Sequence, residues 1–208
     1  MPGEDSSRHP APASPELCAY QTQFEALKQE ARVLVNGMEA DAFNWRPAPD
    51  RWSVGECLDH LNRTGALMVP RLERAIARGR SKGLTAEGPF TYGWLGRWWI
   101  RAMQPASRRK MTTPKVFRPS ASALEPAPVV AAFEALQDDL MALVRAADGL
   151  DLRRVKAASA ALPVLRLSLG VWFASTAAHE ERHLAQARRV MAHAGFPHPE
   201  PADALAEL

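Results

Sequence analysis

One stretch of the sequence decides the fold: residues 165–191 read LRLSLGVWFASTAAHEERHLAQARRVM. Apolar and histidine side chains recur in it at steps of three and four residues, which places them along one face of a helix. The spacing predicts a helix that begins after Pro163 and runs to about Ala194, with Gly195 and Pro197 ending it. The predicted face consists of Leu165, Leu169, Trp172, Thr176, His179, His183 and Val190.

Two earlier segments show the same helical spacing. Residues 17–38 predict a first helix that ends near Ala40, and residues 129–147 predict a third helix that Gly149 closes. Each has a single apolar face, as expected of a helix that packs against a core. The apolar positions are Leu17, Tyr20, Phe24, Leu27, Ala31, Leu34 and Met38 in the first helix, and Val129, Phe133, Leu136, Leu140, Leu143 and Ala147 in the third.

The second helix has a clear start. Ser53 can cap the free amides of the first turn, and Glu56 can reach back to complete a capping box. Gly79 lies where this helix is expected to stop. The apolar stripe consists of Val54, Cys57, Leu58, Leu61, Met68, Leu72 and Ile76.

These four segments predict an all-α fold. No segment shows sustained period-two alternation, and a long connection rich in Gly, Pro, Ser and Thr covers residues 80–127. The expected architecture is a four-helix bundle with a long crossover between helices two and three. The 208 residues, 47% of them hydrophobic, fit one bundle domain at residues 16–198 between tails at residues 1–15 and 199–208.

Composition excludes several classes of protein. The net charge of +3 comes from scattered basic residues, so nucleic acid is not an expected partner. The longest uncharged apolar stretch, residues 167–178, is too short to span a bilayer. The opening MPGEDSSRHP is not an export signal, and two cysteines cannot make a disulfide scaffold. We therefore expect a soluble cytoplasmic protein.

An aromatic cluster lies in the crossover. Trp94, Trp98 and Trp99, together with Arg97 and Arg101, are typical of a helix that lies on a membrane surface. A cover packed over the bundle is the more ordinary interpretation, because tryptophan buries a large area and the chain shows no other anchor.

Three histidines are placed to meet. His179 and His183 are four residues apart, so both rings project from the apolar face of the fourth helix. His60 borders the apolar stripe of the second helix. If the two helices pack together, three imidazoles converge, and three nitrogen ligands with an open position are typical of a catalytic metal site. The alternative to a metal site is that these histidines are part of the core and donate hydrogen bonds to backbone carbonyls.

Other polar residues have simpler interpretations. We expect Glu56 to act as a cap in preference to orienting a ligand, and Cys57 to pack as a small hydrophobe. Gln186 is expected to face the same side as His183, where it could contact a bound ligand. No catalytic side chain stands out. Surface positions are predicted for Glu180, Glu181 and Arg182. No functional role is predicted for His9, His193 and His198.

Two segments resemble a known family. RWSVGECLDHLNRT at residues 51–64 and HEERHLAQARRVM at residues 179–191 are similar to the two hallmark segments of the DinB-like (DinB/YfiT) metalloprotein superfamily. KMTTPKVFRPS and LRLSLGVWFASTAAH also look like this family, so the resemblance covers roughly residues 15–195. It implies a four-helix bundle whose divalent metal is bound by His60, His179 and His183.

The resemblance also implies a range of activities. Relatives include transferases that use thiols such as bacillithiol, mycothiol or glutathione, a thiol-dependent isomerase and hydrolase-like members. A divalent ion, either zinc, nickel, iron or manganese, would activate a low-molecular-weight thiol or a water. The expected partners are a small thiol or an electrophile, and a homodimer is possible. The competing class is a metal- or ligand-binding bundle of the stress-response or interaction type, without turnover.

Overall fold

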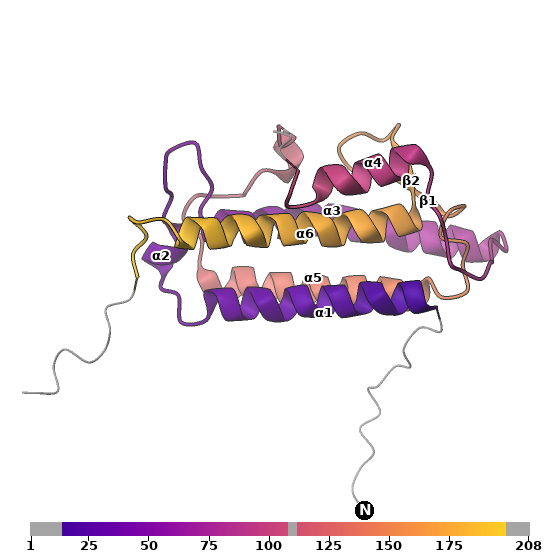
Figure 1. Ribbon diagram of the computed structural model, residues 1–208, viewed down its shortest axis with the longest axis horizontal. Coiled ribbons are helices and arrows are strands. Elements are labelled where there is room, and N and C mark those ends of the chain that lie inside the picture. The colour runs from indigo at the N-terminus through magenta and orange to yellow at the C-terminus, as the bar shows by residue number, and fades with distance from the viewer. Residues whose placement is uncertain (1–13, 108–111, 199–208) are drawn as a thin grey trace, which may run out of the picture.

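The computed structural model describes residues 14–107 and 112–198. The predicted tails at residues 1–15 and 199–208 lie almost wholly outside these ranges. Four long helices lie side by side and form the expected four-helix bundle (Figure 1). In the described ranges, no helix combines the length and the hydropathy needed to cross a membrane. The long helices are α1 (Pro15–Val35), α3 (Val54–Ser81), α5 (Pro126–Ala146) and α6 (Leu169–Met191).

Smaller elements decorate the bundle. Helix α2 follows α1, helix α4 and a 3₁₀ turn lie in the crossover, and two short strands precede α6. The strands pair antiparallel, with Ala157 opposite Leu167. The bounds are α2 (Ala40–Asn44), α4 (Trp94–Met103), η1 (Lys115–Phe117), β1 (Lys156–Ala158) and β2 (Arg166–Ser168).

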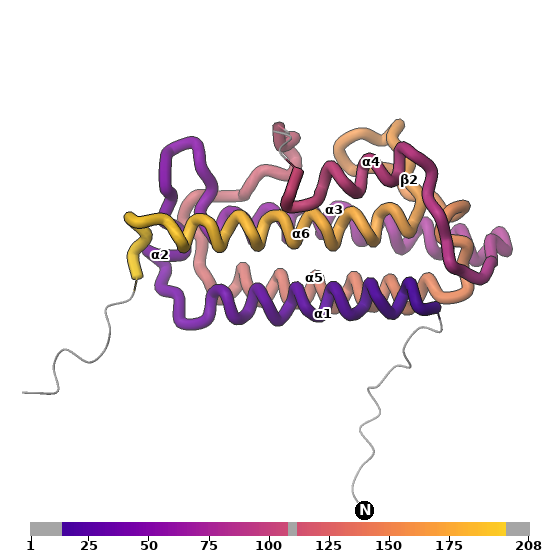
Figure 2. Tube along the Cα trace, viewed as in Figure 1, coloured from indigo at the N-terminus to yellow at the C-terminus, as the bar shows by residue number. Residues whose placement is uncertain are grey.

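The long helices contact one another in the cyclic order α1, α5, α3, α6. Figures 1 and 2 show that α3 and α5 run in the same direction, and that the chain returns along the bundle between them, passing over α6 on its way. The long crossover predicted between the second and third long helices is therefore confirmed. Because α3 and α6 are neighbours, the helices that carry His60 and the histidine pair lie against each other.

Two helix ends differ from the prediction. Helix α1 ends at Val35, because Gly37 takes the left-handed conformation with φ of 70° before α2 begins. Helix α3 continues through Gly79 to Ser81. A Cβ at Gly79 would lie 2.6 Å from Cγ2 of Val155, so this glycine permits close packing in place of ending the helix. The left-handed turn comes later, at Gly83.

The start of α6 was also predicted wrongly. The helix begins at Leu169 and ends at Met191, short of the predicted limits at Pro163 and Ala194. Residues 166–168 are strand β2, which is too short to show a period-two pattern. Trp172 anchors the sheet to α6, since its Nε1 donates to the carbonyl of Ala157 at 3.0 Å.

The core fills the space between the four long helices. Phe24, Phe43, Phe133 and Phe173 are fully buried, and burying a side chain of this size contributes roughly 1.5–3 kcal/mol. These four phenylalanines come from α1, α2, α5 and α6, and the fully buried Leu58 adds α3, so the core joins all four long helices.

Helix α4 lies along α6, as the cover interpretation expects. The Trp99 ring meets that of Trp172 edge to face at 6.4 Å, and Arg182 of α6 donates to the carbonyl of Ala102 at 3.0 Å. The outer face of α4 leaves Trp94 74% and Trp98 41% exposed. One face of the aromatic cluster is therefore packed and the other is open to solvent.

Candidate metal centre

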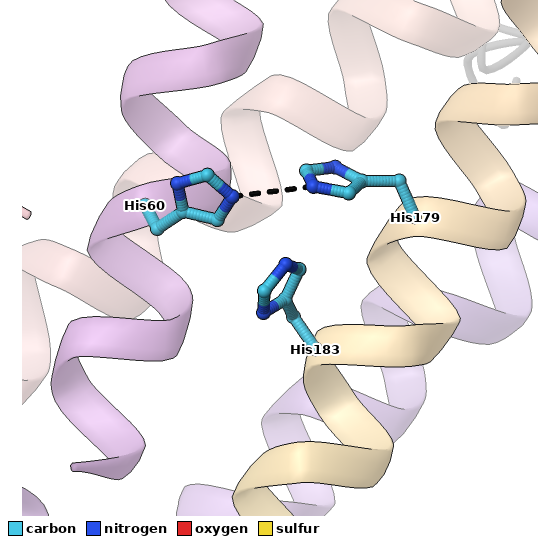
Figure 3. A group of neighbouring side chains, drawn as sticks. All are labelled: His60, His179 and His183. Carbon is cyan, nitrogen blue, oxygen red and sulfur yellow. Dashed lines mark hydrogen bonds between the residues drawn. The ribbon is translucent and has the colours of Figure 1, made fainter. Parts of the chain in front are cut away.

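His60, His179 and His183 converge between α3 and α6. One ring nitrogen from each lies within 4.8 Å of the others, and Nε2 of His60 is 3.2 Å from Nε2 of His179. Figure 3 shows the three rings turned toward one another across the gap between the two helices. The convergence that the sequence predicted is therefore present.

Helix geometry explains this arrangement. His179 and His183 are one turn apart on the same side of α6, and their rings meet edge to face with centroids 4.7 Å apart. His60 reaches them from α3, with its ring 4.6 Å from that of His183. His60 and His183 are only 3% and 8% exposed, so the site lies at the edge of the core.

The 3₁₀ turn η1 fixes the orientation of His60. Nδ1 of His60 lies 2.6 Å from the carbonyl oxygen of Phe117. A carbonyl can only accept, so Nδ1 carries the hydrogen and Nε2 keeps its lone pair. This arrangement, with one nitrogen held by a carbonyl and the other free for a ligand, is usual for metal-binding histidines. Sequence reasoning missed Phe117, because a backbone carbonyl leaves no signal in the sequence.

Burial keeps the three rings neutral. It lowers the pKa of His60. Burial, followed by electrostatic repulsion of a proton by the other two histidines and by Arg182, lowers the pKa of His183 well below the usual value. Burial, followed by the charge of His60, lowers the pKa of His179 to about 3. At neutral pH each ring therefore offers a lone pair, which is the form that binds a metal.

Trp52 packs against the triad. Its ring lies 4.9 Å from that of His60 and is stacked 5.7 Å from that of His183. The side chain immediately precedes the helix cap Ser53, which holds the start of α3 in place beside it. Sequence reasoning missed this contact too, although the position of a tryptophan next to a well-defined cap was a usable signal.

Glu56 acts as the predicted cap. Its backbone amide donates to Oγ of Ser53 at 3.1 Å, and its carboxylate accepts from the amide of Ser53 at 3.0 Å. Arg46 forms an ion pair with the same carboxylate through two nitrogens. Cys57 is fully buried, and burial raises the pKa of its thiol, as expected for a small apolar residue.

Glu180 contradicts the predicted surface position. It is 2% exposed, and burial raises the pKa of its carboxyl to about 8. Its interior neighbour is Gln137 of α5, which is fully buried. Helix α6 contacts α1, α3 and α4, and position 180 lies on its interior side. The sequence held a signal, because position 180 continues the stripe of Phe173, Ala177, Leu184 and Ala187.

The remaining predicted positions are mixed. Glu181 is exposed as expected, but Arg182 is half-buried by its bond to α4. Gln186 lies beside His183, on the side predicted. His193 packs against Trp45 and His198 against Phe196, apart from the triad, while His9 lies outside the described residues.

The donor set fits a divalent cation. Three neutral imidazoles suit zinc, nickel or iron and leave further coordination positions open. Nε2 of His60 accepts from Nε2 of His179, so a cation between them would replace that hydrogen. Nδ1 of His183 is buried without a hydrogen-bond partner among the described residues. An unsatisfied buried nitrogen is costly and is typical of a site completed by a ligand or water.

A cavity of about 460 Å³ opens beside the triad. Trp52 belongs both to its wall and to the contacts of His60 and His183. The α2–α3 connection, the start of α3 and the crossover segment after residue 112 form the cavity. Its lining consists of Arg46, Trp52, Glu56, Thr113, Arg118, Pro119, Ala121 and Ser122.

Comparisons with known proteins agree with this architecture. The solved structure of YfiT from Bacillus subtilis, described as a probable metal-dependent hydrolase with an unusual four-helix bundle topology, matches with a TM-score of 0.58. The match covers 91% of this chain and 94% of YfiT at 14% sequence identity, so it shows a shared fold. A search of curated proteins found no match. The profile of the DinB superfamily matches residues 23–187. The chain belongs to the DinB superfamily.

Proposed function

We propose that His60, His179 and His183 bind one divalent metal ion, and that the protein is a metal-dependent enzyme. The observation that carries the proposal is the convergence of three neutral imidazole nitrogens within 4.8 Å, on two buried histidines and the partly exposed His179. When bound, the ion supplies Lewis-acid chemistry that lowers the pKa of a water or a small thiol and makes it nucleophilic at neutral pH.

The protein's own residues position the ligands and shape the site. The Phe117 carbonyl holds the ring of His60, and Trp52 covers the triad on the side of the cavity. The nearest thiol, Cys57, is buried and has a raised pKa, so it is a poor nucleophile. The carboxylate of Glu56 is held by the helix cap and by Arg46. These constraints favour a nucleophile that comes from solution.

Two nucleophiles remain in the proposal. Water is supported by the likeness to YfiT, which is described as a probable hydrolase. A low-molecular-weight thiol is supported by the resemblance of the sequence to superfamily members that act as thiol S-transferases. The proposal places the protein in a reducing cytoplasm, where such thiols are available. The alternative is a bundle that binds metal or a small ligand without turnover.

The test uses the full chain, freed of metal and reloaded with zinc, nickel, manganese or iron in turn. Each form is assayed for conjugation of thiols to electrophiles and for hydrolysis of activated esters. We expect metal-dependent turnover that His179→Ala abolishes and that His198→Ala, a surface control, leaves unchanged. If the loaded protein shows no turnover with any substrate, the enzyme proposal is wrong and the non-catalytic alternative stands.

A further inference from the structure

The outer wall of the cavity beside the triad is hydrogen-bonded to the bundle. This wall is the crossover segment at residues 113–122, which also holds the carbonyl that bonds His60. The amide of Ser120 donates to Oδ2 of Asp59 on α3 at 2.5 Å. Leu124 exchanges two hydrogen bonds of 2.9 Å with the side chain of Asn44 on α2. These bonds tie the segment and the residues just after it to both neighbouring helices.

Two guanidinium groups line this cavity, but only one is committed elsewhere. Arg46 is held by Glu56, so its charge is largely balanced within the wall. Arg118 is exposed, and its Nε donates to the carbonyl of Thr113 at 3.4 Å. Among the described residues, no carboxylate forms a salt bridge with Arg118. Its two terminal nitrogens are therefore available to a ligand.

The charge of the lining is positive because of Arg118. Arg46 and Glu56 form an ion pair with each other, which leaves the guanidinium of Arg118 as the charge that no lining carboxylate balances. An unbalanced positive charge in a cavity wall favours ligands of negative charge. The planar fork of an arginine matches the two oxygens of a carboxylate or phosphate, and the hydroxyl groups of Thr113 and Ser122 add hydrogen-bond donors in the same wall.

We propose that this cavity binds an oxyanion group of the substrate, with Arg118 as the residue that selects it. This inference rests on the proposed function: the metal-dependent site would take a substrate or thiol that bears a carboxylate or phosphate. The charged end binds at Arg118, and the rest of the molecule extends past Trp52 toward the triad. Arg118 is a specificity residue in this proposal and takes no part in the chemical step.

Binding is tested by calorimetric titration of the full chain with succinate and, separately, with inorganic phosphate, with and without zinc. We expect binding that weakens by about tenfold or more in Arg118→Ala and is partly retained in Arg118→Lys. Arg74→Ala is the matched control, because Arg74 is an exposed arginine of α3 outside the cavity. A preference for succinate or phosphate identifies the oxyanion. If neither anion binds, or Arg118→Ala binds as the wild type does, the proposal is overturned.

A second readout separates specificity from chemistry. With mercaptosuccinate as the thiol, Arg118→Ala should raise KM and leave kcat close to that of the wild type, whereas 2-mercaptoethanol should show no change in either constant. Equal effects on both thiols would overturn the specificity role. The two proposals fail separately: anion binding that depends on Arg118 in a protein without turnover supports the oxyanion site and refutes the enzyme.

Discussion

Acid should destabilise the metal-free protein through its buried histidines. His179 has a folded-state pKa of about 3, far below the value near 6.5 that it has in an unfolded chain. The unfolded state therefore binds a proton between these values and the folded state does not. The stability that His179 contributes is fully present above pH 6.5 and is lost as the pH falls below it. The lowered pKa values of His60 and His183 act in the same direction.

The size of the effect follows from the linkage relation. Each pH unit below 6.5 costs about 1.4 kcal/mol per histidine that stays neutral, so His179 alone lowers the free energy of unfolding by about 1.4 kcal/mol at pH 5.5. Glu180 acts in the opposite direction. Its pKa is raised to about 8, so its contribution to stability increases as the pH falls from 8 toward 4.5. The wild-type curve therefore mixes both effects, and the comparison must be made between variants.

Urea denaturation, followed by circular dichroism with a chelator present, measures this difference at pH 7.0 and pH 5.5. Wild type is compared with His179→Gln, which removes the titrating ring, and with His198→Gln, a control on the surface near the C-terminus. Between pH 7.0 and pH 5.5, we expect the free energy of unfolding of His179→Gln to fall by about 1 kcal/mol less than that of wild type. The control should follow wild type. If the free energy of unfolding falls by the same amount in all three proteins, the neutral state assigned to His179 is wrong.

Three further predictions concern stability. Glu180→Gln should stabilise the metal-free protein relative to wild type, increasingly as the pH rises from 5 to 8, because it removes a carboxyl that resists ionisation. A difference in urea midpoint between variant and wild type that is the same at pH 5 and pH 8 would contradict this. Gly65→Ala should destabilise the bundle by about 1–3 kcal/mol, despite the better helix propensity of alanine, because its Cβ would lie 2.3 Å from Cδ1 of Leu136; a raised melting temperature would show that Leu136 yields. Ser53→Ala should lower the free energy of unfolding, measured by urea titration, by about 1 kcal/mol, because it removes the bond to the amide of Glu56. Ser53→Gly should lower it less, because glycine is favoured at the N-cap position. An unchanged free energy of unfolding would mean that the cap is replaceable.

Local sequence patterns predicted the main elements well. The steps of three and four residues identified all four long helices, and the spacing of Ser53 and Glu56 identified the capping box. The pairing of His179 with His183 also follows from spacing alone, because residues four apart share a helix face. These features depend only on residues close together in the chain.

Features that depend on tertiary contacts were harder to predict. Glu180 was placed on the surface because charged residues usually are, but it lies on the interior face of α6, beside the buried Gln137 of α5. The Phe117 carbonyl and the Trp52 ring reach the triad from segments whose path no periodicity specifies. Strand β2 is three residues long, so an apolar residue within it continued the apparent helical pattern of α6.

The central claim is that three histidines hold one metal ion, and equilibrium dialysis against a fixed concentration of free zinc tests it most directly. Zinc per chain, measured by elemental analysis, should approach one for wild type and for His198→Ala. It should fall close to zero for His60→Ala, His179→Ala and His183→Ala, with circular dichroism showing that each variant is folded. Zinc content that stays at the wild-type level in these three folded variants would contradict the account.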